Sequence, residues 1–184
     1  MKGMRNFKRI VFGIFGLIAL MLLIGIFSRK DFLVEREITI NRSSAEVFEF
    51  LRYQENQIHY NPWLIKYSIS KLEHTGKDGQ VGFRHEWNSS NTEVGSGVES
   101  ITNITNGKRI DIELHFMSPI DRWSHAWLTT DSLNANQTKV KWGFSGTIKY
   151  PLNVVLVFIN MQRQIGNELS EGLDLMKKYL ESNH

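Results

Sequence analysis

An uninterrupted apolar run at residues 10–27 constrains this 184-residue chain most strongly, because its 18 residues include no charged side chain. As an α-helix the run is about 27 Å long, close to the ~30 Å hydrocarbon core of a bilayer. Ser28, Arg29 and Lys30 follow it and provide no cleavage site of small residues. The sequence therefore predicts an uncleaved single-pass transmembrane anchor in residues 1–30, followed by one domain in residues 31–184.

Charged residues are distributed unequally between these two parts. Residues 1–30 contain six basic side chains and no acidic one, so the remaining 16 basic and 19 acidic residues give residues 31–184 a net negative charge. A folded part without a basic excess argues against nucleic acid as a partner. Four basic residues lie on each side of the apolar run, and the terminal amine adds to the N-terminal side. By that small margin the positive-inside rule favours a cytoplasmic N-terminus and an extracytoplasmic domain.

The start of the domain shows the alternation of a strand and then the start signal of a helix. Val34, Ile38 and Ile40 share one side of an alternating segment, which predicts a strand over residues 34–40. Ser43 and Glu46 have the spacing of a capping box, in which the two side chains satisfy free backbone N–H groups of the first turn. A proline at position 62 disfavours helix for the residue before it, so the helical region is expected to end at residues 61–63.

The rest of the chain is predicted to form six strands and one long helix. Turn sequences such as Asn106 followed by Gly107 separate the strand candidates. The strands are expected near residues 66–73, 81–88, 93–104, 109–116, 121–131 and 138–149. Apolar residues then recur at three- and four-residue spacing over residues 152–181, which predicts one continuous amphipathic helix. This order predicts an α+β fold, in which a curved antiparallel sheet of about seven strands wraps around the long C-terminal helix.

Four stretches of the sequence resemble motifs of the START-like (SRPBCC) superfamily, and in particular its polyketide cyclase/dehydrase-like branch. They are residues 37–48, residues 61–63, Trp87 with residues 95–97, and residues 138–146 with residues 161–173. The resemblance covers about residues 34–181 and implies the helix-grip fold. It does not imply one activity, because the superfamily includes lipid carriers, ligand receptors and cyclases.

A sheet covered by a helix can enclose a ligand, and strand alternation indicates which side chains line the interior. Gly166 and Gly172 remove side-chain volume from the covering helix, which favours a cavity, while a packed core is the alternative. The resemblance favours a cavity for a lipid-like or aromatic molecule. The residues predicted to bind this small hydrophobic ligand are Trp63, Phe83, His85, Trp87, Leu114, Phe116, Trp142, Phe144, Ile165 and Leu169.

His85 is the most informative polar residue in this set, because it lies between Phe83 and Trp87 on one strand face. An imidazole with an unperturbed pKa of about 6.5 can act as a general acid or base, or it can hydrogen-bond a ligand. A core histidine with satisfied hydrogen bonds is the alternative. The resemblance implies a large aromatic residue at this position, so His85 is a departure that would tune ligand choice.

The sequence favours a binding domain over an enzyme. Arg122 and Ser124 are the further polar candidates, and they are not enough to assign a catalytic residue. No cofactor motif is present, and the histidines lack the spacing of metal ligands. The absence of cysteine excludes disulfides and Cys-ligated zinc.

Two alternatives to a ligand-binding domain stay open at this point. The first is an enzyme of the cyclase/dehydratase type that uses the same cavity. The second is a non-catalytic interaction domain for another membrane protein. The resemblance places Ala126 and Leu128 inward, which leaves Trp123 and Trp127 on an outer patch that can contact lipid headgroups or a protein.

Overall fold

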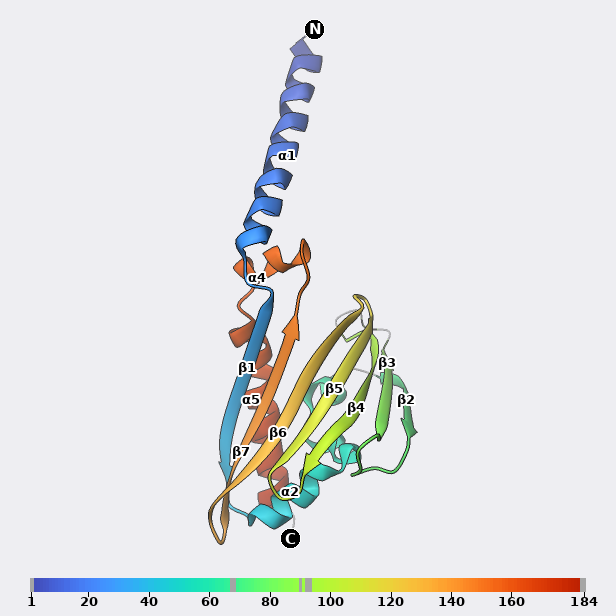
Figure 1. The fold of residues 1–184 in the computed structure, drawn as a ribbon, viewed down its shortest axis with the longest axis vertical. Coiled ribbons are helices and arrows are strands. Elements are labelled where there is room, and N and C mark those ends of the chain that lie inside the picture. Colours follow the sequence, from blue (N-terminus) through green and yellow to red (C-terminus); the bar gives the residue numbers. More distant parts are fainter. Residues whose placement is uncertain (1, 67–68, 90, 92–93, 183–184) are drawn as a thin grey trace.

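The structure is a computed structural model that describes residues 2–66, 69–89, 91 and 94–182. Figure 1 shows α1 projecting as a single helix from one end of a domain built on one curved sheet. In chain order the elements are α1 (Lys2–Phe27), β1 (Asp31–Ile40), α2 (Ser44–Arg52), the 3-10 helix η1 (Gln54–His59), α3 (Pro62–Lys66), β2 (Ile69–Thr75), β3 (Arg84–Ser89), β4 (Ser96–Thr105), β5 (Arg109–Ser118), β6 (Arg122–Asn134), β7 (Gln137–Thr147), the 3-10 helix η2 (Leu152–Val154), α4 (Val155–Phe158) and α5 (Met161–Ser182).

All seven strands belong to one antiparallel sheet with the order β1-β7-β6-β5-β4-β3-β2. α5 packs mainly along β1, at one side of the sheet. α2 lies at the end of the sheet farthest from α1 (Figure 1). The predicted α+β class, with its antiparallel sheet and C-terminal helix, is confirmed.

α2 and α3 start where local side chains satisfy free backbone groups. Ser43 and Glu46 form the predicted capping box, since the hydroxyl accepts from the Glu46 N–H at 3.4 Å and the carboxylate accepts from the Ser43 N–H at 3.1 Å. The expected end of the helical region at residues 61–63 is wrong. Pro62 instead opens α3, at the first helical position, where its missing N–H costs nothing. The Asn61 side chain caps this helix by accepting from the Trp63 N–H at 3.0 Å.

Each predicted strand is present, although several boundaries differ from the expectation. Lys66 belongs to α3, and residues 67, 68 and 93 lie outside the described residues. β3 begins at Arg84, because the loop before it places Gly82 at a φ of 91°. Such a positive φ suits glycine and interrupts a strand.

The prediction of one continuous helix over residues 152–181 is wrong, because the chain breaks between α4 and α5. Ile159 has an extended backbone with φ −98° and ψ 123°. Asn160 then caps α5, since its Oδ1 accepts from the Arg163 N–H at 3.0 Å. Asparagine side chains compete for backbone hydrogen bonds within a helix and favour the cap position instead. The segment at residues 150–159 is therefore separate from α5, and α4 lies beside the end of α1 (Figure 1).

The hydrophobic core fills the space between the sheet and α5. At Gly172 a Cβ would overlap the ring of Trp142 and crowd the backbone oxygen of Tyr60. Trp142 also meets the rings of Tyr60 and Trp63 edge to face, with centroids 5.5 and 6.3 Å apart. The core residues that are at most 1% exposed are Val34, Ile40, Val47, Leu51, Tyr60, Ile110, Val140, Leu169, Leu173 and Met176.

Gly166, like Gly172, makes room for a side chain of the sheet, which here is the charged side chain of Arg36. A Cβ at this position would overlap the guanidinium of Arg36, whose Nη1 donates to the Gln162 side chain at 3.2 Å and whose Nη2 donates to the Gln162 backbone oxygen at 2.5 Å. The two glycines thus accommodate a guanidinium and an indole. The expectation that they leave volume for a ligand is wrong at these two positions.

Leu173→Ala should lower the free energy of unfolding by about 2–5 kcal/mol, because Leu173 is 1% exposed and its truncation leaves a cavity. The matched control is Asp174→Ala on the exposed side of the same turn, with an expected change within about 0.5 kcal/mol. Denaturant titration of the detergent-solubilised chain, followed by tryptophan fluorescence, measures both values. Equal effects of the two substitutions would contradict this packing of α5.

Candidate functional site

The strand register arranges the inward-facing side chains in rows across the sheet. The row nearest to the α1 end contains Trp87, Gly97, Phe116 and Arg122. The second row contains His85, Glu99, Leu114, Ser124, Gly146 and Phe32. Residues that are far apart in the chain thus form one continuous surface under the helices.

Burial differs between the two ends of this inward face. Towards α2, Ile110, Leu128 and Val140 are at most 2% exposed. Towards α1 several apolar side chains that face inward are only partly buried, although His85 and Ser124 beside them are at most 2% exposed. We use the name α1-end opening for this group of partly buried residues, which are Phe32, Trp87, Leu114, Phe116, Phe144 and Ile165.

Aromatic contacts shape the rim of the α1-end opening. Trp87 meets Phe116 edge to face with 5.5 Å between centroids, and the Arg122 guanidinium lies 4.4 Å from the Phe116 centroid. On the other side Phe32 stacks on Phe144 at 6.0 Å. Such a rim offers π-faces and apolar edges to a flat or aliphatic molecule.

A buried polar group lies behind this rim, where His85 and Glu99 face each other across β3 and β4. His85 Nδ1 is 3.4 Å from Glu99 Oε1, and His85 is 2% exposed. The same carboxylate oxygen accepts a hydrogen bond from Gln57 Nε2 at 2.6 Å, and this amide also donates to Gln54 Oε1 at 2.6 Å. Among the described residues neither ring nitrogen of His85 has a partner with hydrogen-bond geometry.

Burial shifts both groups towards their uncharged forms. Loss of hydration lowers the pKa of His85 to about 4, and the nearby His74 acts in the same direction. Loss of hydration raises the pKa of the Glu99 carboxyl to about 7, although the Gln57 hydrogen bond favours the ionised form. Between these two pKa values both groups are uncharged.

Ser124 supplies a second polar group in the same row. Its side chain is 1% exposed, and its Oγ has no hydrogen-bond partner within the described part of the chain. A buried hydroxyl without a partner costs free energy, which a ligand atom or a water molecule can recover. His85, Glu99 and Ser124 therefore give the interior behind the rim a limited capacity for hydrogen bonding.

Comparisons with known proteins identify the architecture. No protein-family model matches the sequence, and no curated protein sequence matches it significantly. Among solved structures, norcoclaurine synthase from Thalictrum flavum aligns with a TM-score of 0.64 and 17% identity over 88% of this chain and 93% of that one. Ara h 8.0201 aligns with a TM-score of 0.58 and 17% identity, covering 83% and 99%. A protein of Thermobifida fusca aligns with a TM-score of 0.59 and 14% identity, covering 83% and 95%.

The chain has the helix-grip fold of these solved structures. This confirms the resemblance found in the sequence at the level of the fold. Because the identities are 14–17%, the shared property is the helix-grip architecture.

Within the helix-grip domain the ten predicted ligand-binding residues divide by depth. Phe83, Trp142 and Leu169 are at most 6% exposed and pack in the core, and Trp63 lies against Trp142. His85 is buried beside Glu99. The other five belong to the α1-end opening, namely Trp87, Leu114, Phe116, Phe144 and Ile165.

Glu99 and the glutamines of η1 are the polar residues that sequence analysis missed. One signal was present, because alternation places Glu99 on the same strand face as Gly97 and Ile101. An acidic residue on an apolar strand face is unusual and indicates a buried partner. That partner could not be named without the register of β3 and β4.

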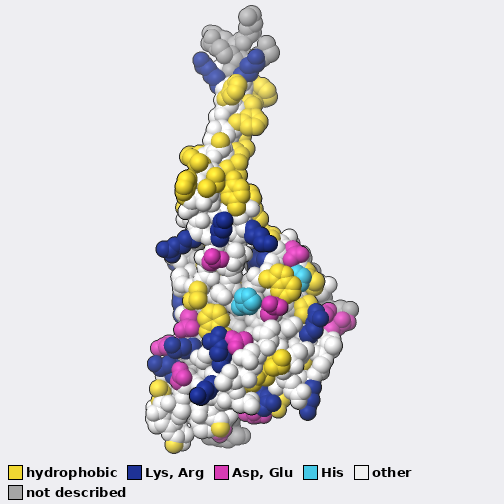
Figure 2. Space-filling view, in the orientation of Figure 1, with side chains coloured by type: hydrophobic (Ala, Val, Ile, Leu, Met, Phe, Trp, Pro, Cys, Tyr) yellow, Lys and Arg dark blue, Asp and Glu magenta, His cyan; other side chains and the backbone are white. Residues whose placement is uncertain are grey.

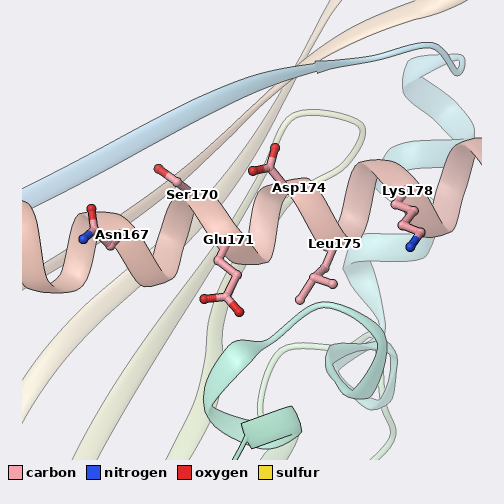
Figure 3. Close-up of a pocket in the computed structure, with 6 residues that line it drawn as sticks. All are labelled: Asn167, Ser170, Glu171, Asp174, Leu175 and Lys178. Carbon is pink, nitrogen blue, oxygen red and sulfur yellow. The ribbon is translucent and has the colours of Figure 1, made fainter.

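Two depressions lie on the surface of the domain, away from the interior between the sheet and α5. One, of about 420 Å³, is open and runs along α5; Figure 3 shows its six lining residues, which include Glu171 and Leu175, on that single helix. The other lies between residues 41–46 and the β6–β7 turn, beside Arg42 and Asn136. None of the ten predicted binding residues lines either depression.

Opposite pH dependences of stability are expected from His85 and Glu99. The lowered pKa of His85 makes stability rise as the pH goes from about 4 to 6.5, because only the unfolded chain binds that proton. The raised pKa of Glu99 makes stability fall as the pH goes from 4.5 to about 7, because only the folded chain keeps that proton. Each slope is about 1.4 kcal/mol per pH unit, so the two nearly cancel where they overlap.

Replacing one partner should reveal the slope of the other. In Glu99→Gln the free energy of unfolding should rise with pH up to about 6.5, and in His85→Phe it should fall between 4.5 and about 7. Denaturant titrations of the detergent-solubilised chain across this pH range measure both profiles. Slopes of the same sign in the two variants would contradict the burial of this pair.

Proposed function

We propose that the protein is a membrane-anchored helix-grip domain that binds a small hydrophobic molecule in the α1-end opening. The observation that carries this proposal is the partial exposure of Trp87, Phe116 and Phe144 at the α1 end of an inward face whose centre is buried. Interiors without a ligand function are normally packed to high density, with large apolar side chains in full contact. Inward-facing rings that still reach solvent are therefore suited to hold another molecule.

The properties of α1 support the anchor. Residues Asn6–Phe27 form a helix long and apolar enough to cross a membrane, and 6% of its most apolar window is buried against the rest of the protein. Ile10, Phe15 and Leu23 are each more than half exposed. Figure 2 shows hydrophobic side chains along the projecting helix. A bilayer would remove this surface from water, with the domain on the extracytoplasmic side and, by the positive-inside count, the N-terminus in the cytoplasm.

The chemistry of the opening defines the class of ligand. Its rim is aromatic and apolar apart from the Arg122 guanidinium over Phe116, and the His85–Glu99 pair behind it is uncharged between pH values of about 4 and about 7. This favours a neutral lipid-like or aromatic molecule with one or two hydrogen-bonding groups, which can reach Ser124 or His85. Norcoclaurine synthase, with the same fold, was solved in complex with dopamine and hydroxybenzaldehyde, which are small aromatic molecules.

Leu114→Trp should fill the α1-end opening and displace the ligand, because Leu114 is a partly buried inward residue in its second row. Glu113→Trp is the matched control, since it adds the same side chain to the outer face of the same strand. Mass spectrometry of small molecules that copurify with each full-length variant in lipid nanodiscs tests this. A compound present with the native chain and with Glu113→Trp, but lost from Leu114→Trp, is the expected ligand. Identical small-molecule profiles for all three proteins would contradict the proposed site.

Catalysis of the cyclase/dehydratase type is the second candidate function, and the His85–Glu99 pair favours it. The two groups lie 3.4 Å apart behind the rim, and the Glu99 pKa of about 7 suits proton transfer near neutral pH. The pair is thus a candidate acid and base for a carbonyl compound held in the opening. The low pKa of His85 keeps the imidazole uncharged at neutral pH.

His85→Phe separates binding from catalysis. In a binding domain the affinity for the copurified compound should be kept or raised, because an apolar ring replaces a buried polar one. In an enzyme that uses His85 as acid or base, turnover should fall by about 10²–10⁴-fold with binding retained. Product formation by mass spectrometry and binding by tryptophan quenching give the two readouts. An unchanged turnover would remove His85 from any catalytic role.

The interaction-domain alternative has less support from the outer face of the sheet. Trp123 and Trp127 do face outward as predicted, with Ala126 and Leu128 buried on the inner side. However, Trp127 covers Gly143 and its Nε1 donates to Glu35 at 3.1 Å. Trp123 is 53% exposed and stacks on His115, which leaves one exposed tryptophan in place of the expected pair.

A further inference from the structure

Residues 150–159 are an uncharged, solvent-facing segment at the end of the domain that carries α1. The segment reads Tyr-Pro-Leu-Asn-Val-Val-Leu-Val-Phe-Ile and has one strongly polar side chain, Asn153. Asn153 is fully buried, whereas five large apolar residues around it are 39–65% exposed. These five are Tyr150, Leu152, Val157, Phe158 and Ile159.

Asn153 fixes this segment to the last turn of α1. Its Nδ2 donates to the backbone oxygen of Gly25 at 2.6 Å and to that of Ser28 at 3.2 Å. Carbonyl groups at the C-terminal end of a helix have no partner within the helix, so the amide satisfies groups that would otherwise need water. The ring of Tyr150 packs against Gly25, where a Cβ would come within 3.3 Å of it. The exposed apolar residues are therefore held at the level where the apolar run of α1 ends.

The surroundings of the segment match the boundary of a bilayer. Arg29, Lys30 and Lys149 are exposed next to it, and Figure 2 shows Lys and Arg side chains around the junction of the helix and the domain. Cations at this level can meet lipid phosphates, while the apolar side chains beside them can enter the outer acyl region. A surface with this composition is costly in water and favourable at a membrane interface.

We propose that residues 150–159 form an interfacial segment, which inserts its apolar side chains into the headgroup–acyl boundary of the bilayer that α1 spans. This inference rests on the membrane anchor of the proposed function. A bilayer is favoured over a second protein because Asn153 holds the segment against the end of α1, which is itself sheathed in lipid if it spans the membrane. The domain then has two membrane contacts, and α5, which begins directly after the segment, keeps Ile165 and the α1-end opening near the bilayer.

Site-directed spin labelling tests the proposal directly, because the native chain has no cysteine. Single substitutions Phe158→Cys and Val157→Cys place a nitroxide on the segment. Ile18→Cys places one on α1 as the test of the anchor, and Asn136→Cys places one on the exposed β6–β7 turn, far from α1. The full-length variants are reconstituted in vesicles of phosphatidylcholine and phosphatidylglycerol. Collision with oxygen, which concentrates in lipid, is compared with collision with a water-soluble nickel chelate.

The expected ratio of the oxygen collision rate to the nickel collision rate is high for the label at residue 18 and low for the label at residue 136. For the labels at residues 157 and 158, this ratio should be several-fold higher than at residue 136. Ratios at residues 157 and 158 equal to that at residue 136, with residue 18 in lipid, would overturn the interfacial segment and keep the anchor. Protection of residues 157 and 158 from both reagents would overturn it in favour of a covering protein. A water-exposed residue 18 would overturn the anchor and the interfacial segment together.

Discussion

The close approach of α5 to the sheet at Gly172 and Trp142 is the contact on which the rest of the fold depends. The indole of Trp142 fills the space that a side chain at position 172 would need, and its ring meets Tyr60 edge to face. One side chain thereby joins β7, α5 and the segment after α2. The interior is tightly packed at this level, whereas Phe116 and Phe144 at the α1 end are only partly buried.

The buried His85–Glu99 pair limits what the open end can accommodate. Both groups are uncharged between pH values of about 4 and about 7, so their side of the interior presents no net charge to a bound molecule. A charged group of a ligand placed beside this pair would lose its hydration without gaining a counter-charge from it, which costs much free energy. A neutral molecule needs only one hydrogen-bonding atom within reach of Ser124 or His85. The same pair thus supports binding of a neutral compound, and the closeness of a carboxyl with a raised pKa to an imidazole is the reason that proton-transfer catalysis is the second candidate.

Local patterns predicted most of the fold, whereas features that depend on distant partners could not be predicted. Strand alternation and the Ser43–Glu46 capping box involve neighbouring residues, and both appear in the structure. Gly166 and Gly172 were interpreted as cavity-forming because their partners, Arg36 and Trp142, are joined to them only by tertiary packing. The role of Glu99 depends on strand register in the same way. The break before α5 was missed because the apolar spacing continues through Asn160, although that residue carries the cap signal.

Strand pairing itself explains why α1, the uncharged segment and the opening share one end of the molecule. β1 and β7 are antiparallel neighbours with Asp31 opposite Thr147, so the chain that precedes β1 and the chain that follows β7 must leave the sheet at the same edge. The backbone hydrogen bond from Ile148 N–H to the Lys30 oxygen, at 2.8 Å, extends this pairing beyond the strands. The pairing of the backbone alone therefore places α1 next to residues 150–159. The side chain of Asn153 then fixes the two segments together by its hydrogen bond to the Gly25 backbone oxygen. In the proposed arrangement, the nearness of the opening to the bilayer follows from sheet topology, so a ligand dissolved in lipid would reach Phe116 and Phe144 without first crossing bulk water.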